Sequence, residues 1–259
     1  MIERIYVIPH GDEIIDMPDK ESAEMNKKIR EVSKNDKSDV KLIISPHGLR
    51  LENGTVIPMD SYYYGYYKTK TRTFRSKFRN DLELASLIYK NTSYITSPGY
   101  YITSSGEHSI FPLDFGSIIP LSFFKKGDII SIGQPRINCR QKLIEFGNDL
   151  YKTLELYNKK VSVIISADQS HTHSNGIYGY SDLSNVYDNK IISWIKNNDD
   201  SIKDLDDNII ERAKPDSYWN MLILYGMIKN RYRLIFKYYY VMDYFSMLLA
   251  VADKAYIYE

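Results

Sequence analysis

The sequence predicts an α/β protein: a three-layer sandwich with a mostly parallel central sheet, helices on both of its faces, and an added β-hairpin. Three observations favour this fold class. Short apolar runs rich in β-branched residues are typical of strands buried on both faces. Segments with helical spacing separate these runs, and such alternation is typical of α/β folds. An Asn-Gly dipeptide between two further apolar runs predicts the hairpin.

The predicted strands and helices alternate along the first two thirds of the chain. Buried strands are expected at residues 5–8, 40–44 and 161–165. The spacing of apolar residues predicts helices at 20–33, 81–89 and 137–156. Asn80 and Asn138 are the expected N-caps of the second and third helices, because an Asn side chain accepts hydrogen bonds from the free N–H groups of a first turn.

The remaining elements are a hairpin, three helices and an ambiguous tail. Asn53-Gly54 stands between Leu49-Arg50-Leu51 and Thr55-Val56-Ile57, which predicts a two-residue hairpin turn. The alternation of cations and threonines over 68–73 predicts a strand with one charged face. Further helices are expected at 186–197, 201–212 and 217–228. From Tyr238 onward the pattern does not distinguish helix from strand.

Composition bounds the class of protein. The 259 residues carry 34 Lys and Arg against 33 Asp and Glu, so the net charge of +1 gives no reason to expect nucleic acid or an anionic membrane as a partner. Neither a membrane-spanning stretch nor a signal peptide is evident, and a single cytoplasmic domain over 1–259 is expected. The only cysteine, Cys139, excludes an internal disulfide and a Cys-rich zinc site. Many of the 24 tyrosines occur in clusters, which could line a ligand site but are more typical of strand packing or of a subunit interface in a homo-oligomer.

The five histidines are the most informative residues. The first predicted strand runs into Pro9-His10-Gly11, the second into Pro46-His47-Gly48, and the third into a segment with His171 and His173. Each strand therefore delivers histidine just past its carboxyl end, and this edge of an α/β sheet is where ligands bind. Proline ends the strand and glycine permits a sharp turn beside the imidazole. We expect the histidines to share one site.

Two or three imidazoles at one point suggest a metal ion. Without thiolates, the ligands would be imidazole and carboxylate, and two histidines with one carboxylate are typical of non-haem Fe(II) oxygenases, although zinc accepts similar ligands. Candidate carboxylates are Asp12, Glu13, Asp168 and Asp216. Spacing alone favours Asp216 as the N-cap of the helix that follows it.

The chain resembles the class III extradiol ring-cleavage dioxygenases, the LigB-like superfamily, in particular its uncharacterised archaeal-type branch, and more distantly the Memo-like proteins. The resemblance covers most of the chain. It is carried by five motifs: Pro9-His10-Gly11, Ser45-Pro46-His47-Gly48, Asp114-Phe115-Gly116 with Pro120-Leu121, Ser166-Ala167-Asp168-Gln169-Ser170-His171, and Pro215-Asp216 before an apolar helix.

The resemblance implies a function and a role for each matching residue. His10 and His47 correspond to the two imidazole ligands of Fe(II), and Asp216 falls where the dioxygenases place a glutamate ligand. His171 corresponds to the acid/base histidine, which takes a proton from the catechol. The implied substrates are a small catechol-like aromatic and O₂.

One departure from the family pattern concerns the substrate side of the site. Ring-cleaving members usually have Asp-His-Gly where this chain has Asp114-Phe115-Gly116. Two histidines are candidates to replace the missing one: His108, in the same predicted loop, and His173, which in an extended segment would face the same side as His171.

Three functional hypotheses follow. The first is a non-haem Fe(II) extradiol-type dioxygenase that cleaves a catechol-like ring with O₂. The second is a zinc-dependent hydrolase that uses the same ligands, since zinc lowers the pKa of a bound water. The third is a Memo-like metal-binding or regulatory protein without ring cleavage, which the Phe115 substitution favours.

Overall fold

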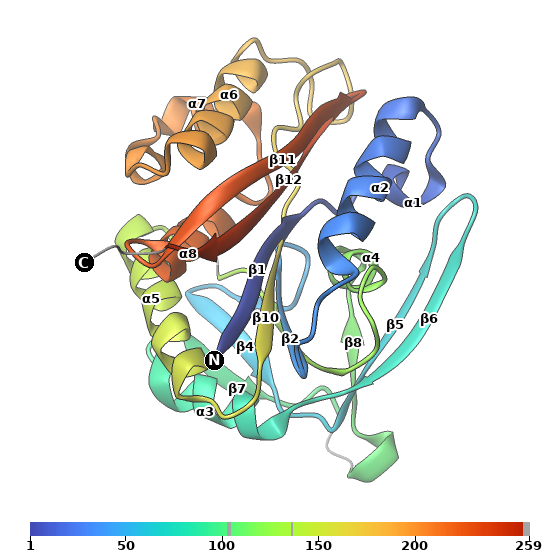
Figure 1. The fold of residues 1–259 in the computed structure, drawn as a ribbon, viewed down its shortest axis with the longest axis vertical. Coiled ribbons are helices and arrows are strands. Elements are labelled where there is room, and N and C mark those ends of the chain that lie inside the picture. The colour runs from blue at the N-terminus through green and yellow to red at the C-terminus, as the bar shows by residue number, and fades with distance from the viewer. Residues whose placement is uncertain (103–104, 136, 256–259) are drawn as a thin grey trace.

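A computed structural model of the chain describes residues 1–102, 105–135 and 137–255 (Figure 1). Its centre is a six-stranded sheet in the order β11-β12-β1-β10-β2-β9. The strands β1 (Ile2–Ile8), β10 (Val161–Ser166), β2 (Val40–Ser45) and β9 (Asp128–Gly133) run parallel. β12 (Phe245–Lys254) pairs antiparallel with β1, and β11 (Tyr232–Met242) with β12. The three strands predicted from their apolar runs are adjacent at the centre of this sheet.

Both faces of the sheet are buried, and each strand contributes alternate side chains to two separate cores. From β1, Ile5 and Val7 point into one core, while Tyr6 and Ile8 point into the other. Helices cover the first face: α3 (Leu82–Thr92), α5 (Arg140–Leu156), α6 (Leu183–Asn197), α7 (Asp207–Ala213) and α8 (Tyr218–Ile228). On the second face lie α1 (Glu13–Asp16), α2 (Lys20–Ser33) and α4 (Phe115–Leu121). The predicted three-layer α/β architecture is confirmed.

Two small three-stranded sheets flank the central one. The first is β3 (Arg50–Leu51), β4 (Gly54–Pro58) and β7 (Thr96–Gly99). The pairs Arg50–Thr55 and Leu51–Gly54 confirm the Asn53-Gly54 hairpin. The second sheet is β6 (Thr73–Arg79), β5 (Tyr62–Lys68) and β8 (Ile110–Leu113), beside α4 (Figure 1). The tyrosine clusters 62–67 and 238–240 lie in strands.

Two of the predicted helix N-caps are wrong by one residue. Asp81, not Asn80, caps α3 by accepting a hydrogen bond from the Leu84 N–H. The Asn80 amide is already engaged, since it donates to the carbonyls of Pro58 and Asp60. Likewise Cys139, not Asn138, stands at the N-cap of α5.

Two further predictions about local structure need correction. The helix expected at 201–212 is broken into a 3₁₀ turn, η2 (Ser201–Asp204), and α7, because Asp206 caps a new helix. The strand expected at 68–73 is a turn between β5 and β6, since Asp16 accepts hydrogen bonds from the N–H groups of Lys70 and Thr71. The tail from Tyr238 is a strand pair, β11 and β12, as far as the structure describes it; 256–259 lie outside the described residues.

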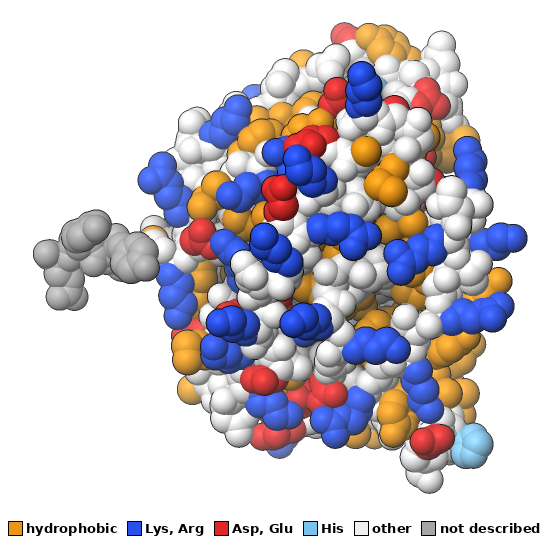
Figure 2. Space-filling model, turned by 45° about the vertical axis from the view of Figure 1, so that its right-hand side comes forward, with side chains coloured by type: hydrophobic (Ala, Val, Ile, Leu, Met, Phe, Trp, Pro, Cys, Tyr) orange, Lys and Arg blue, Asp and Glu red, His pale blue; other side chains and the backbone are white. Residues whose placement is uncertain are grey.

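The exposed faces carry both charges. On the side of the molecule that Figure 2 displays, Lys and Arg side chains are spread widely over the surface rather than concentrated in one patch. None of the helices in the described part of the chain combines the length and the apolar character needed to cross a bilayer.

Candidate metal centre

Three loops meet at the carboxyl edge of the central sheet. His10 follows β1, His47 follows β2, and His171 follows β10, which lies between those two strands. All three histidines line one cavity of about 320 Å³. The expectation that the strand ends bring these histidines together is therefore met by the structure.

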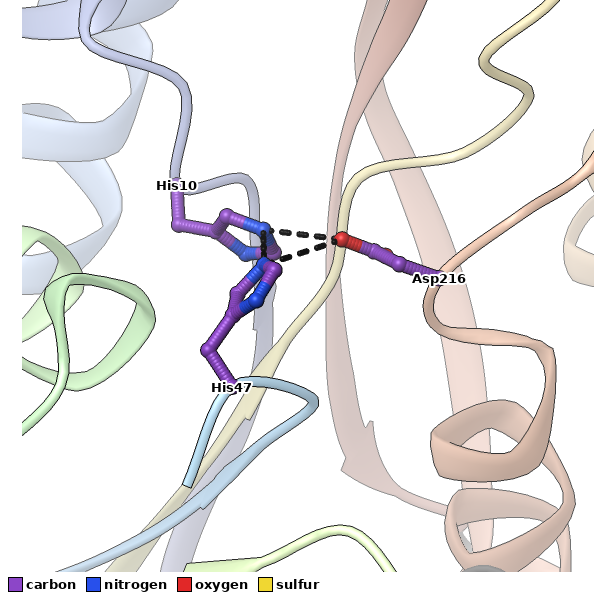
Figure 3. Close-up of side chains that lie close together, drawn as sticks. All are labelled: His10, His47 and Asp216. Atoms are coloured by element: carbon purple, nitrogen blue, oxygen red, sulfur yellow. Dashed lines mark hydrogen bonds and ion pairs between the residues drawn. The ribbon is translucent and has the colours of Figure 1, made fainter. Parts of the chain in front are cut away.

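Two of the histidines and one aspartate converge on a single point (Figure 3). The Nε2 atoms of His10 and His47 lie 3.1 Å apart. Oδ2 of Asp216 lies 3.0 Å from the first nitrogen and 3.3 Å from the second. Asp216 does not cap α8, because Ser217 occupies the N-cap position. The helix-cap interpretation of Asp216 is wrong, and its carboxylate faces the two imidazoles instead.

This arrangement fits a metal ion. Nitrogen ligands lie about 2.0–2.1 Å from zinc, so two that share one ion are about 2.8–3.4 Å apart at right to tetrahedral angles. The three ligand-atom distances fall in or at the edge of this range. The second oxygen of Asp216, Oδ1, is buried and has no hydrogen-bond partner in the described part of the chain. A buried, unpaired carboxylate oxygen is costly, and a cation would satisfy it.

Charges around this point are strongly coupled. Burial alone would lower the pKa of His10, but the carboxylates of Asp168 and Asp216 outweigh it and raise that pKa to about 9. Burial alone would raise the pKa of Asp216, whereas His10 and His47 hold it well below its usual range. Burial raises the pKa of Asp168, only partly opposed by His10. The carboxylates thus favour a positive charge at the point where the ligand atoms meet, and a bound divalent cation would provide it.

A buried serine fixes which nitrogen of His10 is free. Ser166 Oγ donates to the Gly116 carbonyl at 2.5 Å, and therefore accepts from His10 Nδ1 at 2.9 Å. With its proton on Nδ1, the imidazole presents the lone pair of Nε2 to the cluster. Metal-binding histidines commonly have such a partner on their other nitrogen.

Asp168 supports His10 from the other side. Its Oδ1 accepts the backbone N–H of His10 at 3.0 Å, and its Oδ2 lies 3.4 Å from His10 Nε2. Asp168, His171 and Asp216 form a second group whose ligand atoms lie within 4.8 Å of one another. This group is another set of side chains that could hold an ion.

The Asp114-Phe115-Gly116 motif positions His47. Asp114 Oδ1 accepts from Ser45 Oγ at 2.6 Å, and Ser45 Oγ accepts the backbone N–H of His47 at 3.2 Å. A Cβ on Gly116 would lie only 2.7 Å from Ser45 Oγ and 3.0 Å from His47 Cδ2, so glycine permits the close approach. The Phe115 ring packs on the His47 imidazole with centroids 4.2 Å apart.

His171 lies across the cavity with one nitrogen available. Its Nδ1 is 2.9 Å from the Gln169 carbonyl, which only accepts hydrogen bonds, so Nδ1 carries the proton and Nε2 the lone pair. The ring stacks on Phe245, with centroids 5.7 Å apart and planes 18° from parallel. The backbone N–H of His171 donates to the Ala213 carbonyl. His171 is thus a held imidazole with a free basic nitrogen.

The other two histidines do not belong to this site. His108 is exposed on η1 (Gly106–His108), and β8 separates it from Phe115 by four strand residues, about 13 Å of chain. His173 turns away from the cavity, because its Nε2 pairs with Asp188 Oδ2 at 2.6 Å inside the protein. Neither histidine is among the described residues that line the cavity, where the replacement is expected.

The cavity has aromatic walls that the sequence reveals only in part. Tyr67, Tyr244 and Phe245 line it, although they come from hairpins far from the histidines in sequence. Tyr67 belongs to one of the tyrosine clusters that could line a ligand site, whereas no local signal marks Tyr244 or Phe245.

The segments 93–106 and 176–184 are rich in Gly and Tyr and flank candidate histidines in the sequence, which predicts that both line the pocket. Segment 176–184 contributes Tyr178. The other segment, 93–106, contributes no described residue to this cavity, and its residues 103 and 104 lie outside the described residues.

The fold and the cluster define an α/β protein with two histidines and one carboxylate at the carboxyl edge of its sheet. A family model described as the catalytic LigB subunit of aromatic ring-opening dioxygenase matches residues 4–251. The chain belongs to this LigB family, so the fold is dioxygenase-like. The crystal structure of an uncharacterized protein from Escherichia coli K12 is similar, with a TM-score of 0.65 and 11% sequence identity. That similarity covers 96% of this chain and 98% of the other. Among curated protein sequences, none matches this chain.

Proposed function

We propose that the protein is a non-haem Fe(II)-dependent dioxygenase of the extradiol type, which opens a catechol-like ring with O₂. The observation that carries the proposal is the convergence of His10 Nε2, His47 Nε2 and Asp216 Oδ2 within 3.0–3.3 Å of one another. Two histidines and one carboxylate with open positions are the ligand set of non-haem Fe(II) oxygenases. Membership of the LigB family supports the same reaction class.

The residues around the proposed ligands have chemical roles in this reaction. Bound Fe(II) would supply a Lewis acid for the catechol oxygens and a redox partner for O₂. His171 presents the lone pair of Nε2 to the cavity and accepts a proton from a catechol hydroxyl. Phe115 and Phe245 line the cavity and offer apolar contact to an aromatic substrate. Both oxygen atoms of O₂ enter the product as the ring carbon–carbon bond beside the hydroxyl pair breaks, so no external reductant is consumed.

Oxygen uptake tests this proposal. The protein is reconstituted anaerobically with Fe(II), and O₂ consumption and visible absorbance are recorded with a small panel of catechols. We expect stoichiometric O₂ uptake and a new ring-fission chromophore. His47→Ala should lose both iron and uptake, whereas His108→Ala, a matched histidine outside the cavity, should retain both. Iron bound equally by the two variants would contradict the ligand assignment.

His171→Gln separates metal binding from proton transfer. The variant should keep its iron, because His171 is not among the three proposed ligands, and should lose about 10²–10⁴-fold in turnover if it is the base. Unchanged turnover in this variant would show that the proton goes elsewhere.

A second candidate function follows from Phe115, which packs on His47 where ring-cleaving members usually have histidine. In that case the protein binds a metal and a ligand without ring cleavage, as in the Memo-like interpretation. Tight iron binding with no O₂ uptake on any catechol would favour this candidate. Zinc held in preference to iron, together with hydrolysis of an ester or amide, would favour the hydrolase.

A further inference from the structure

The cavity beside the proposed metal ligands has an uneven charge composition. Its described lining contains four carboxylates and three imidazoles but neither lysine nor arginine. An anionic substituent on a substrate would therefore find neither lysine nor arginine among the described lining residues. The carboxylates are Asp12, Glu13, Asp168 and Asp216.

Three of these carboxylates already have partners. Asp168 and Asp216 face His10 at 3.4 and 3.0 Å. Asp12 accepts a hydrogen bond from the Tyr67 hydroxyl at 2.9 Å, and the nearby Lys70 partly offsets its charge. These three carboxylates interact with His10 or with Tyr67 in the cavity wall, so we do not expect them to bind a substituent of the substrate.

Glu13 is different. Within the described chain, its carboxylate has neither a cation within 4 Å nor a hydrogen bond from another residue, and it is only partly buried. Burial raises the pKa of Glu13 and a hydrogen bond from its own backbone opposes this, while the carboxylates of Asp12, Asp168 and Asp16 raise it further. An unpartnered carboxylate that lines a cavity is available to a ligand.

Glu13 is also close to the loop that carries His10. A Cβ placed on Gly11, the residue after His10, would lie 3.0 Å from Glu13 Oε2 and 2.8 Å from the Phe245 ring. The carboxylate and the aromatic wall therefore approach the same point of that loop. A substrate held at the cluster and packed on Phe245 would bring a side-chain substituent near Glu13.

The aromatic walls favour the same kind of group. Tyr67, Phe115, Tyr178, Tyr244 and Phe245 surround the cavity, and the faces of aromatic rings attract cations. Lys214 Nζ lies 5.9 Å from the ring centroid of the lining residue Tyr178, although Lys214 is not itself among the lining residues.

We propose that this cavity selects catechols with a cationic ammonium side chain over catechols with a carboxylate side chain, and that Glu13 is the residue that determines this specificity. This inference rests on the proposed function in one respect, that the catechol ring lies at the metal cluster. Glu13 would pair with the ammonium group, while the ring packs against Phe245. A carboxylate side chain would instead be repelled by Glu13 and find neither lysine nor arginine among the described lining residues.

Three catechols with side chains of similar length test the proposal: dopamine, 4-ethylcatechol and 3,4-dihydroxyphenylacetate. Binding to the anaerobic Fe(II)-loaded protein is measured by calorimetry, and O₂ uptake is measured separately. We expect dopamine to bind about tenfold more tightly than 4-ethylcatechol, and the carboxylate to bind more weakly than either. Equal affinity for the ammonium and carboxylate compounds would overturn the proposal.

Variants of Glu13 identify the residue responsible. Glu13→Gln should lose about tenfold in affinity for dopamine and little for 4-ethylcatechol, while Glu13→Asp, which keeps the charge, should retain the preference. Glu31→Gln, an exposed position on α2, is the matched control and should bind like the unchanged protein. A preference that survives Glu13→Gln in a folded protein would exclude Glu13.

The two measurements separate this inference from the proposed function. If the ammonium preference is present and Glu13-dependent but no catechol is opened, the specificity stands and the dioxygenase proposal fails. If rings are opened without regard to side-chain charge, the dioxygenase stands and the specificity fails.

Discussion

Replacing Ser166 by alanine removes one buried hydroxyl that satisfies two polar groups. The Oγ atom accepts from His10 Nδ1 at 2.9 Å and donates to the Gly116 carbonyl at 2.5 Å, and Ser166 is fully buried. In Ser166→Ala the imidazole N–H and the carbonyl both lose their partner. Each buried unsatisfied group costs about 1–3 kcal/mol, so the free energy of unfolding should fall by about 2–5 kcal/mol.

The same substitution should weaken metal binding. Without an acceptor on Nδ1, the ring of His10 is no longer held in the tautomer and orientation that present Nε2 to Asp216. Loss of such a partner typically costs 10–100-fold in metal affinity, and we expect about this loss in a competition titration against a chromophoric chelator.

Ser162→Ala is the matched control for this experiment. Ser162 is also a fully buried serine on β10, but its hydroxyl bonds to Asp36, away from the histidines. This variant should be less stable while its metal affinity stays within about twofold of the unchanged protein. If Ser166→Ala is destabilised but binds metal as tightly as Ser162→Ala, Ser166 does not orient His10.

Three further substitutions test the packing and the charges. His173→Ala should lower the free energy of unfolding by about 1–3 kcal/mol, because buried Asp188 loses a partner. The metal affinity should not change, and weaker metal binding would show that His173 contributes to the metal site. Gly226→Ala places a Cβ 2.0 Å from the Ile144 carbonyl oxygen, where α8 packs on α5. Chemical denaturation should therefore show that the free energy of unfolding falls by about 3 kcal/mol or more. A fall of less than about 1 kcal/mol would contradict this close contact. Burial alone would raise the pKa of Asp81, but hydrogen bonds and the ion pair with Lys159 lower it below its ordinary value of 3.8. The ionised Asp81 side chain therefore stabilises the folded state above the unfolded pKa, and this contribution is lost as pH falls below about 3.8. Asp81→Asn should therefore unfold with a flatter acid dependence between about pH 2 and 4, and an unaltered acid limb would exclude Asp81 as a contributor.

The central strands and α2 could be predicted because their signals are local. Residues 40–44 and 161–165 are mostly apolar and are buried on both faces, as is typical of parallel strands in the middle of a sheet. The cap of α3 could not be predicted as readily, because Asn80 and Asp81 are both good capping residues. The choice depends on the Pro58 and Asp60 carbonyls that engage Asn80, which are distant in sequence.

The candidate site was predictable only where its residues follow strands. His10, His47 and His171 could be found because each comes directly after an apolar run. Asp216 was identified by the resemblance to the dioxygenases, since spacing alone favoured a helix cap. The direction of His173 depends on its pairing with Asp188 on α6, a tertiary contact that no local pattern encodes.

The proposed ligands are far apart in the chain, since His10 and Asp216 are separated by 206 positions. During synthesis the amino-terminal histidines leave the ribosome long before the aspartate exists, so a nascent or truncated chain has an incomplete set of ligands. Metal acquisition is therefore expected only in a nearly finished polypeptide whose β1, β2 and α8 have met. A metal ion at the proposed site would then indicate that the chain has folded completely. Chains whose synthesis stops early would not bind the metal.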